Sequence, residues 1–264
     1  MDFGIRDKPA LVVGGSKGIG FEVARQLAAE GCRVAVMART KTDVDTAVAR
    51  IRADGGTALG IAADVTNPEQ IGDAVRTVTD EYGPPLIVIG QARHQHPGDF
   101  ADIDDLDAYR ASFEAYTMSQ IHLLRAVLPA MQAAGWGRFV HIGSATAKEP
   151  AGKIHHAVAN TTRPSTVGLL KTVSDEYAQY GITVNTVAPG WIETDNALTY
   201  LRNHAGVATE EDRRQFLLGQ GVRAGRMGKP HEIASLITYL CSEPAGYITG
   251  AWIEVDGGLH RSAF

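Results

Sequence analysis

The stretch ALVVGGSKGIGFEVARQLAAEG, residues 10–31, decides the fold of this chain. Its apolar start is typical of a buried strand, and its second half carries apolar residues at helical spacing before a helix stop at Gly31. Between them lies GGSKGIG, residues 14–20, where glycine lets the backbone approach a pyrophosphate that the free amides of the helix start attract. Alone, this motif is weak evidence, because an ordinary glycine turn is the alternative. The strand before it and the amphipathic helix after it favour a dinucleotide site.

Apolar runs of strand length recur along the rest of the chain and alternate with longer helix-periodic segments. After the first run at 10–14, they are 33–38, 58–63, 86–90, 138–143, 182–188 and 251–255. The alternation predicts an α/β doubly wound fold, with parallel strands and crossover helices on both faces of one sheet. Residues 196–225 break the pattern, because they are polar and helical and precede the next long helix. Insertions after a strand's carboxyl end usually cover the ligand crevice, so we expect a substrate-covering insertion there.

Composition indicates one domain, residues 1–264, because a chain with 44% hydrophobic content can bury a substantial core and shows no composition break. The net charge is −5 and the basic residues are scattered, which argues against a nucleic-acid or anionic-membrane partner. No apolar run reaches membrane-span length, and the N-terminus lacks the order of a signal peptide, so we expect a cytoplasmic protein. Cys32 and Cys241 lie in apolar contexts typical of buried thiols and indicate neither a disulfide nor a zinc site.

The type of dinucleotide can be inferred at the end of the second strand, which reads VMARTK. An acidic residue there would bind a ribose 2′-hydroxyl, whereas the chain has Ala38 followed by Arg39, with Lys17 in the glycine turn. This pattern favours NADP(H), although both cations are also common as solvated surface charges. Asp64, which closes the third strand, has two interpretations: it accepts from the adenine amine, or it caps the helix that begins near Pro68.

Four further motifs carry a family resemblance: GRFVHIGS at 137–144, GITVNTVAPGWIETD at 181–195, GRMGKPHEIA at 225–234 and YITGAWIEVDGG at 247–258. With GGSKGIG, they make nearly the whole chain resemble a short-chain dehydrogenase/reductase, similar in layout to the 3-oxoacyl-carrier-protein reductase branch. The resemblance implies a Rossmann-type fold, a homotetramer, and a nicotinamide beneath Pro189 and Gly190. The cofactor-binding residues expected from the motifs and the resemblance are Gly14, Ser16, Lys17, Gly18, Ile19, Gly20, Arg39, Asp64, Val65, Gly90, Arg163, Pro189, Gly190, Ile192 and Thr194.

The family also implies a catalytic Asn, Ser, Tyr and Lys tetrad, of which the chain keeps Ser144. Counting back from RAVLPAM places the asparagine position on Tyr116. Counting back from VGLLKTVSDE places the tyrosine on Ala159 and the lysine on Arg163, while a register two residues earlier places the tyrosine on Ala157. An NNAG-like stretch after the fourth strand is also replaced, by GQAR.

The loss of the tyrosine removes the proton donor of the family's reaction. Ketone reduction needs a proton at the oxygen, which the family's tyrosine supplies, and alanine has no proton to give. Arg163 keeps a positive charge but is never readily deprotonated, so it can stabilise charge without relaying protons. Because Ala159 and Arg163 are four residues apart on a helix, they share a face, and we expect the guanidinium to point into the crevice.

Four groups are candidates to replace the tyrosine: His155 and His156, if the helix extends back to them, Tyr116 from the neighbouring helix, and the pair His94 and His96 after the fourth strand. The alternatives are surface or subunit-contact histidines and a packed aromatic. Residues expected near the substrate are His94, His96, His155 and Trp191. His94 and His96 lack further ligands at suitable spacing, so we expect no metal.

Three functions remain open from the sequence. The first is an NADPH-dependent reductase of a conjugated C=C or C=N bond, because charge left on a substrate oxygen could be stabilised by Ser144 and Arg163. The second is a non-redox dehydratase, isomerase or cyclase that uses the histidines, and the third is a cofactor-binding pseudo-enzyme. Trp191, Tyr200 and Phe216 suggest a hydrophobic or ring-bearing substrate, or else pack within the covering segment.

Overall fold

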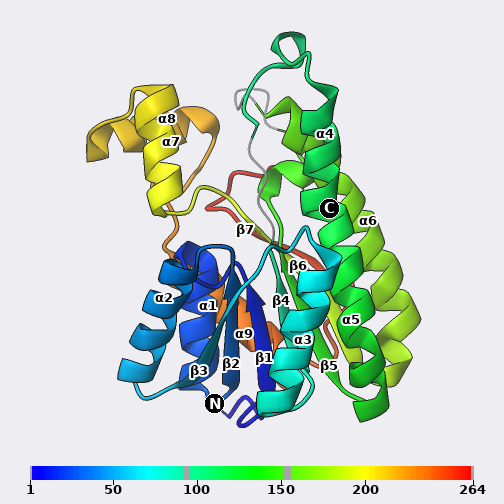
Figure 1. Ribbon diagram of the computed structural model, residues 1–264. Coiled ribbons are helices and arrows are strands. Elements are labelled where there is room, and N and C mark those ends of the chain that lie inside the picture. Colours follow the sequence, from blue (N-terminus) through cyan, green and yellow to red (C-terminus); the bar gives the residue numbers. More distant parts are fainter. Residues whose placement is uncertain (1, 92–95, 151–155, 263–264) are drawn as a thin grey trace.

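Seven parallel strands form one sheet at the centre of the protein (Figure 1). The computed structural model describes residues 2–91, 96–150 and 156–262. The sheet order is β3-β2-β1-β4-β5-β6-β7, so the first three strands extend the sheet to one side of β1, and β4 and the later strands extend it to the other. The strands are β1 (Pro9–Val13), β2 (Arg33–Ala38), β3 (Thr57–Ala62), β4 (Ile87–Gly90), β5 (Gly137–Ile142), β6 (Ile182–Pro189) and β7 (Trp252–Val255).

Helices cover both faces of this sheet. The helices are α1 (Gly18–Ala29), α2 (Lys41–Ala53), α3 (Pro68–Tyr82), α4 (Leu106–Phe113), α5 (Ser119–Ala134), α6 (Ala157–Tyr177), α7 (Asp195–Ala205), α8 (Glu210–Gln220) and α9 (Pro230–Leu240). Helices α1, α2 and α9 pack on one face, and α3, α5 and α6 pack on the other. The doubly wound α/β fold expected from the sequence is therefore confirmed, and each strand lies within one residue of its predicted bounds.

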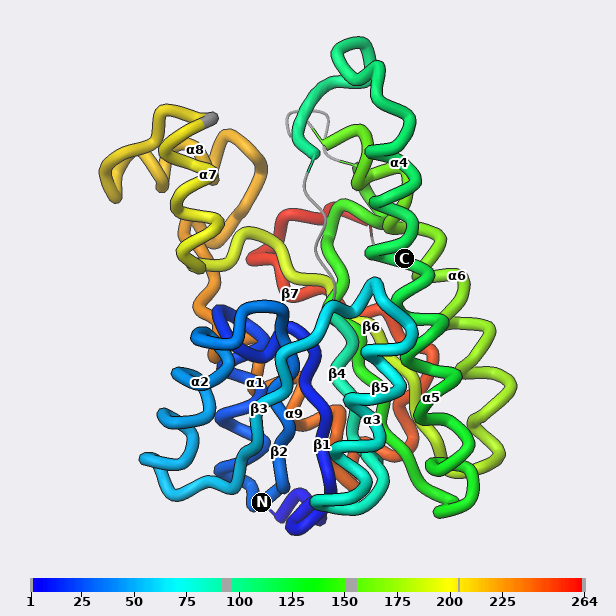
Figure 2. The backbone as a smooth tube through the Cα atoms, in the orientation of Figure 1, coloured from blue at the N-terminus to red at the C-terminus, as the bar shows by residue number. Residues whose placement is uncertain are grey.

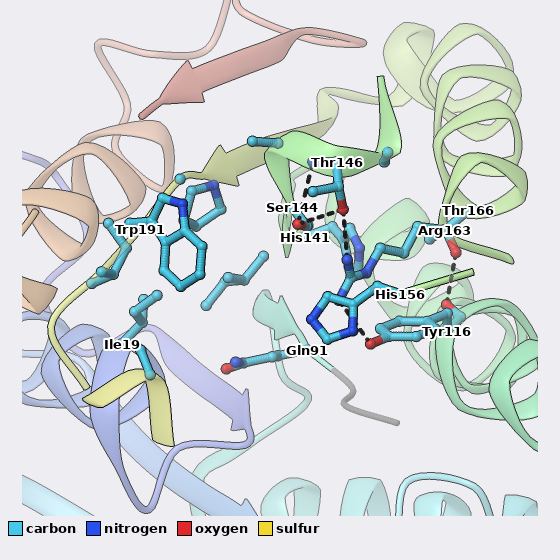
Figure 3. A pocket seen from close by; sticks show the side chains of 18 of the residues that line it. Ile19, Gln91, Tyr116, His141, Ser144, Thr146, His156, Arg163, Thr166 and Trp191 are labelled. Atoms are coloured by element: carbon cyan, nitrogen blue, oxygen red, sulfur yellow. Dashed lines mark hydrogen bonds between the residues drawn. The ribbon is translucent and has the colours of Figure 1, made fainter. Parts of the chain in front are cut away.

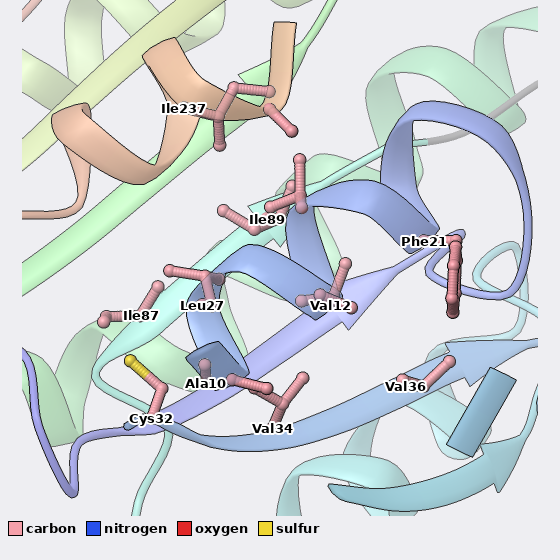
Figure 4. Close-up of a cluster of buried hydrophobic side chains, with 14 of the residues drawn as sticks. Ala10, Val12, Phe21, Leu27, Cys32, Val34, Val36, Ile87, Ile89 and Ile237 are labelled. Atoms are coloured by element: carbon pink, nitrogen blue, oxygen red, sulfur yellow. The ribbon is translucent and has the colours of Figure 1, made fainter. Parts of the chain in front are cut away.

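The core between β1 and α1 explains why residues 10–31 determine this arrangement (Figure 4). Val12 of β1 and Leu27 of α1 belong to one apolar layer with Ile89 and Ile237, and all four are fully buried. Burying each such side chain contributes roughly 1.5–3 kcal/mol. Cys32 lies in the same layer as a free, buried thiol, and burial raises its pKa to about 12. Cys241 is likewise buried and free, as the sequence predicts.

Residues 196–225 form most of α7 and α8, which lie together beyond the carboxyl ends of the strands (Figure 2). This segment has a small apolar core of its own, made by Leu201, Val207, Leu217, Val222 and Met227. Thr194 caps α7 by accepting a hydrogen bond from the Ala197 amide, and Thr209 and Asp212 form a reciprocal capping box on α8. Within the described ranges, no helix has the length and apolar character needed to cross a membrane.

Candidate active site

A first cavity of about 450 Å³ opens at the glycine turn, at the carboxyl ends of β1, β2 and β3. Gly14 has a φ of +68°, which favours glycine. Gly20 does not line this cavity; a Cβ there would strike the Gly14 carbonyl oxygen, so its role is the close contact between α1 and β1. Of the expected cofactor residues, the cavity brings together Gly14, Ser16, Lys17, Gly18, Ile19, Arg39, Asp64, Val65 and Thr194.

The start of α1 suits an anion. Lys17 is the N-cap residue, but its side chain accepts no hydrogen bond from the amides of the first turn, so Lys17 leaves those amides available to a ligand. Amides of this kind attract phosphate because the positive end of the helix dipole lies beside them. The close-packed glycines and the uncapped helix therefore fit the pyrophosphate of a dinucleotide.

Two cations expected to select NADP(H) lie at this cavity with different surroundings. Arg39 is exposed. The Lys17 ammonium is 2.7 Å from Asp43 Oδ2, so a ligand phosphate would compete with that carboxylate. Asp64 Oδ1 accepts hydrogen bonds from the amide and hydroxyl of Thr66, while Asn67 caps α3. Of the two interpretations of Asp64, the capping role is therefore wrong, because Asn67 lies closer to the first amides of the helix.

A second cavity of about 260 Å³ continues from the first and holds the polar groups expected to act on a substrate (Figure 3). Ile19, Gln91, Thr194 and Asn196 line both cavities. Other expected residues that line the second cavity are Tyr116, Ser144, His156, Arg163, Pro189, Gly190, Trp191 and Ile192. The cofactor and catalytic residues predicted far apart in the sequence thus meet along one continuous crevice.

Arg163 connects the polar side chains of this second cavity (Figure 3). Its Nη1 donates to Thr146 Oγ1 at 2.6 Å, and Thr146 Oγ1 lies 3.2 Å from the Ser144 hydroxyl. Its Nη2 donates to the Tyr116 hydroxyl at 3.2 Å, and the guanidinium carbon is 5.2 Å from the centre of the Tyr116 ring. None of the described residues lining the cavity is acidic, so the guanidinium gives this space a net positive character.

Tyr116 owes its position to an irregular helical segment, η2 (Glu114–Met118), which has π-helical geometry between α4 and α5. Such segments free a backbone carbonyl and are frequent at functional sites. Here the Tyr116 carbonyl accepts a hydrogen bond of 2.8 Å from Thr166 of α6. The Tyr116 ring is only 7% exposed, and its hydroxyl end lies at the cavity.

The start of α6 differs from the expectation that the helix extends back to the histidines. The helix begins at Ala157, with His156 as N-cap residue in a non-helical conformation. His156 nevertheless lines the cavity, and its ring centre is 5.4 Å from that of Tyr200 at an interplanar angle of 37°. Ala159 is buried and does not line the cavity.

Several expected residues are not brought into the crevice. Gly90 is buried at the end of β4, where a Cβ would strike Gln120 and Phe139, so its backbone is packed against protein and lines neither cavity. His96 lines neither cavity either. His94 and His155 lie outside the described residues. Trp191 and Tyr200 line the second cavity, whereas Phe216 packs edge-on against Trp191 at 5.4 Å within the covering segment.

The structure adds residues that the sequence analysis missed. His141 of β5 lines the second cavity while 4% exposed, and burial lowers its pKa to about 4, although its Nδ1 lies 3.1 Å from the Gly90 carbonyl. A histidine in the apolar run RFVHIG was the available signal. Gln91 lies between the two cavities, and its Oε1 has no hydrogen-bond partner among the described residues.

Comparisons with known proteins find reductases that match this chain over nearly its whole length. A protein-family model described as enoyl-(acyl carrier protein) reductase matches residues 13–260. The 3-oxoacyl-(acyl-carrier-protein) reductase FabG of Vibrio cholerae is 34% identical over 257 residues, covering 97% of this chain and 98% of that protein. L-sorbose reductase from Gluconobacter frateurii, solved with NADPH and L-sorbose, has a TM-score of 0.91 and 27% identity, covering 99% of this chain and 100% of that one. A Serratia marcescens short-chain dehydrogenase/reductase mutant has a TM-score of 0.85 and 30% identity, with 97% and 98% covered.

Proposed function

Because the chain belongs to the short-chain dehydrogenase/reductase family, we propose that it is an NADP(H)-dependent reductase with a non-standard active site. In this proposal it reduces a conjugated C=C or C=N bond, or a carbonyl, of a hydrophobic small molecule. Ala159 and Arg163 then occupy the positions of the family's tyrosine and lysine. The single observation that carries the proposal is the connected set of Ser144, Thr146, Arg163 and Tyr116 in a cavity continuous with the glycine turn.

The first cavity would hold the cofactor. The amides at the start of α1 would bind the pyrophosphate, and Arg39 and Lys17 would meet a 2′-phosphate, which favours NADPH over NADH. The structure of L-sorbose reductase with NADPH supports this choice. When bound, the cofactor supplies a hydride at the second cavity.

The polar groups of the second cavity stabilise negative charge on a substrate oxygen. Ser144 and Arg163 supply an O–H donor and N–H donors within one chain of hydrogen bonds. No described residue lining the cavity is acidic, so no carboxylate there neutralises the positive charge of Arg163. Donors that are already in place stabilise developing charge without further reorganisation. An enone reduced at its β-carbon develops this charge on its oxygen, so the reaction does not need a tyrosine acid at residue 159. His156 or water can then protonate the α-carbon.

Carbonyl reduction is the second candidate, and the geometry of Tyr116 favours it. Its hydroxyl lies 3.2 Å from a guanidinium nitrogen, so a phenol and a cation stand side by side as in the family's tyrosine and lysine pair, but on different elements. The cation stabilises the phenolate that remains after proton donation. The similarity to FabG of Vibrio cholerae and to L-sorbose reductase, which are both carbonyl reductases by name, supports this candidate.

The substrate end of the cavity favours a ring-bearing molecule. Trp191 and Tyr200 face it with ring centres 6.2 Å apart, and His156 adds a third planar group. Flat side chains of this kind bind flat apolar ligands while fixing their orientation. Trp191 and Tyr200 lie immediately before and within α7, so the covering segment would contribute the specificity of the proposed reaction.

The decisive experiment uses NADPH with deuterium on its transferable position and a panel of cyclic enones and matched saturated ketones. Label at the β-carbon of the product supports conjugate reduction, whereas label at the carbinol carbon supports carbonyl reduction. Turnover of a substrate with no label in the product and no change in cofactor absorbance would replace both by a non-redox reaction. Binding of NADPH without turnover of any compound in a broad panel would favour a cofactor-binding pseudo-enzyme.

A further inference from the structure

A histidine and an aspartate form a buried pair directly behind Ser144. His260 Nδ1 lies 2.6 Å from Asp256 Oδ2, and the His260 amide donates to the same oxygen at 2.9 Å. The two side chains are only 3% and 8% exposed. Asp256 also packs against Gly190, where an added Cβ would lie 2.8 Å from the Asp256 Cα, so the pair adjoins the turn that would hold the nicotinamide.

The second ring nitrogen of His260 contacts the backbone that follows Ser144. Its Nε2 lies 3.0 Å from the carbonyl oxygen of Ala145, the first residue of the short helical turn η3 (Ala145–Ala147). A carbonyl oxygen and a carboxylate oxygen can only accept hydrogen bonds. Both contacts are therefore hydrogen bonds only when each ring nitrogen carries a hydrogen, which is the imidazolium form.

We propose that His260, protonated and anchored by Asp256, is a positioning residue that holds η3 against the C-terminal segment and so fixes the Ser144 hydroxyl. The inference depends on Ser144 acting in the proposed reductase, but the geometry of the pair does not. The neighbouring Leu259 lines the substrate cavity, so the same contact also fixes part of its wall. A histidine that bridges two acceptors in this way acts on the reaction through Ser144, without touching the substrate.

The surroundings of the ring favour a positive charge. Besides Asp256, two carboxylates of the described chain lie near it: Glu254 of β7 at 3.8 Å from Nδ1, and Glu149 after η3 at 3.8 Å from Nε2. The one cation in this group, Lys148, is 3.1 Å from Glu254 and partly neutralises it. Burial raises the pKa of Asp256, but hydrogen bonds from His260 and the Gly258 amide outweigh this and hold it below its ordinary value.

If the His260 ring loses one of its two hydrogens, one of its two hydrogen bonds is lost. One ring nitrogen would then present a lone pair to an oxygen that also has only lone pairs, so that contact would become repulsive. The contact with Ala145 is the more easily lost, because the His260 amide keeps Asp256 in place. Turnover should therefore fall when the ring loses this proton and the contact with Ala145 is broken. NADPH binding in the first cavity should change little, since His260 does not line it.

Nitrogen NMR of protein labelled with 15N-histidine tests the charge of the ring without any substrate. We expect one of the nine histidines, identified by its loss in His260→Gln, to show two protonated ring nitrogens at pH 7. A neutral tautomer at pH 7 would overturn the proposal. Because this measurement needs no turnover, its failure is separate from a failure of the proposed reductase activity.

Kinetics of His260→Gln and Asp256→Asn test the positioning role with a substrate found in the enone and ketone panel. We expect kcat to fall by about 10–100-fold, the alkaline decline of kcat to disappear in His260→Gln, and the Kd for NADPH to stay within about twofold. The matched control is His231→Gln, an exposed histidine on α9, which should keep the parent kcat and pH profile. An unchanged alkaline decline in His260→Gln would overturn the proposal, even if that variant were less stable.

Treatment with a chelator tests whether these side chains bind a metal ion instead. The ligand atoms of Glu254, Asp256 and His260 lie within 4.8 Å of one another, a spacing that a divalent cation could bridge. We expect the parent protein to keep its activity after exhaustive EDTA treatment. Loss of activity that Zn²⁺ or Mg²⁺ restores would assign these side chains to a cation and overturn the hydrogen-bonded role of His260.

Discussion

At the scale of single residues, Arg163 determines what the site can do, because it is the only fixed charge among the described residues that line the substrate cavity. Its two terminal nitrogens contact hydroxyls on different elements, Thr146 and Tyr116, and its Nε has no partner in the described part of the chain. A guanidinium with unused donors in a half-buried space is poised to bind an oxygen of a ligand.

We predict that Arg163→Gln lowers kcat by about 10²–10³-fold, because it removes a donor to the developing oxyanion. Arg163→Lys should recover only part of this loss, since an ammonium keeps the charge but cannot reach Thr146 and Tyr116 together. Steady-state kinetics with the enone and its matched ketone measure both. The control is Lys171→Gln, an exposed cation farther along α6. Equal kcat values in the parent and Arg163→Gln would remove Arg163 from the chemistry.

We predict that residues at the opposite end of the crevice determine the cofactor preference. NADPH should bind more tightly than NADH, and Arg39→Asp should reverse the preference. Asp43→Asn should strengthen NADPH binding a few-fold, because it frees Lys17 from an exposed ion pair of the kind worth roughly 0.2–1 kcal/mol. Fluorescence titration with both cofactors measures each constant. Equal affinities for NADPH and NADH in the parent protein would contradict the assignment to NADP(H).

At the scale of elements, the sequence predicted those helices and strands whose form depends on residues close together in the chain. The β1 strand, the glycine turn and α1 follow from apolar periodicity and glycine positions within one stretch, and Gly31 ends the helix region with a φ of +86° as expected. The π-helical segment η2 and the start of α6 at Ala157 were not predictable, because they depend on contacts between helices distant in sequence. The hydrogen bond from Thr166 to the Tyr116 carbonyl is one such contact.

Strand β5 contains a buried histidine that no periodicity argument identifies as part of a site. The alternation of RFVHIG places His141 on the same face of the sheet as Phe139, but only the tertiary structure brings its ring beneath the substrate cavity. The ring is neutral near pH 7, because burial lowers its pKa to about 4 from the ordinary value of 6.5.

This depressed pKa predicts acid lability in a defined window. Below the unfolded-state pKa the unfolded chain binds a proton that the folded chain does not, so the stabilisation is complete above pH 6.5 and is lost as the pH falls toward 4. The effect amounts to roughly 3 kcal/mol in the free energy of unfolding. Urea unfolding at several pH values should show it in the parent and in His231→Gln, an exposed-histidine control. A free energy of unfolding in the parent that stays constant between pH 6.5 and 4 would refute it.

At the scale of the whole molecule, the surface around α4 carries several large apolar side chains exposed to solvent. Phe100, Leu106 and Phe113 are 80%, 66% and 41% exposed and lie on η1 (Phe100–Asp102) or α4. Large exposed apolar side chains that lie close together in this way are typical of protein interfaces. This surface lies on the other side of the molecule from α7 and α8 in Figure 1, so its burial between chains would leave the covering segment outside the interface.

We therefore predict a homotetramer in which the surface around α4 is buried between chains. Light scattering should give a mass near four times the 28.2 kDa of one chain. Leu106→Glu combined with Phe113→Glu should lower this mass, because two charges would have to be buried without partners. Leu218→Gln, which changes a 37%-exposed apolar side chain on α8, is the matched control and should leave the mass unchanged. A parent mass near that of a single chain would contradict the assembly. A tetramer that persists in the double variant would show that other surfaces hold it together.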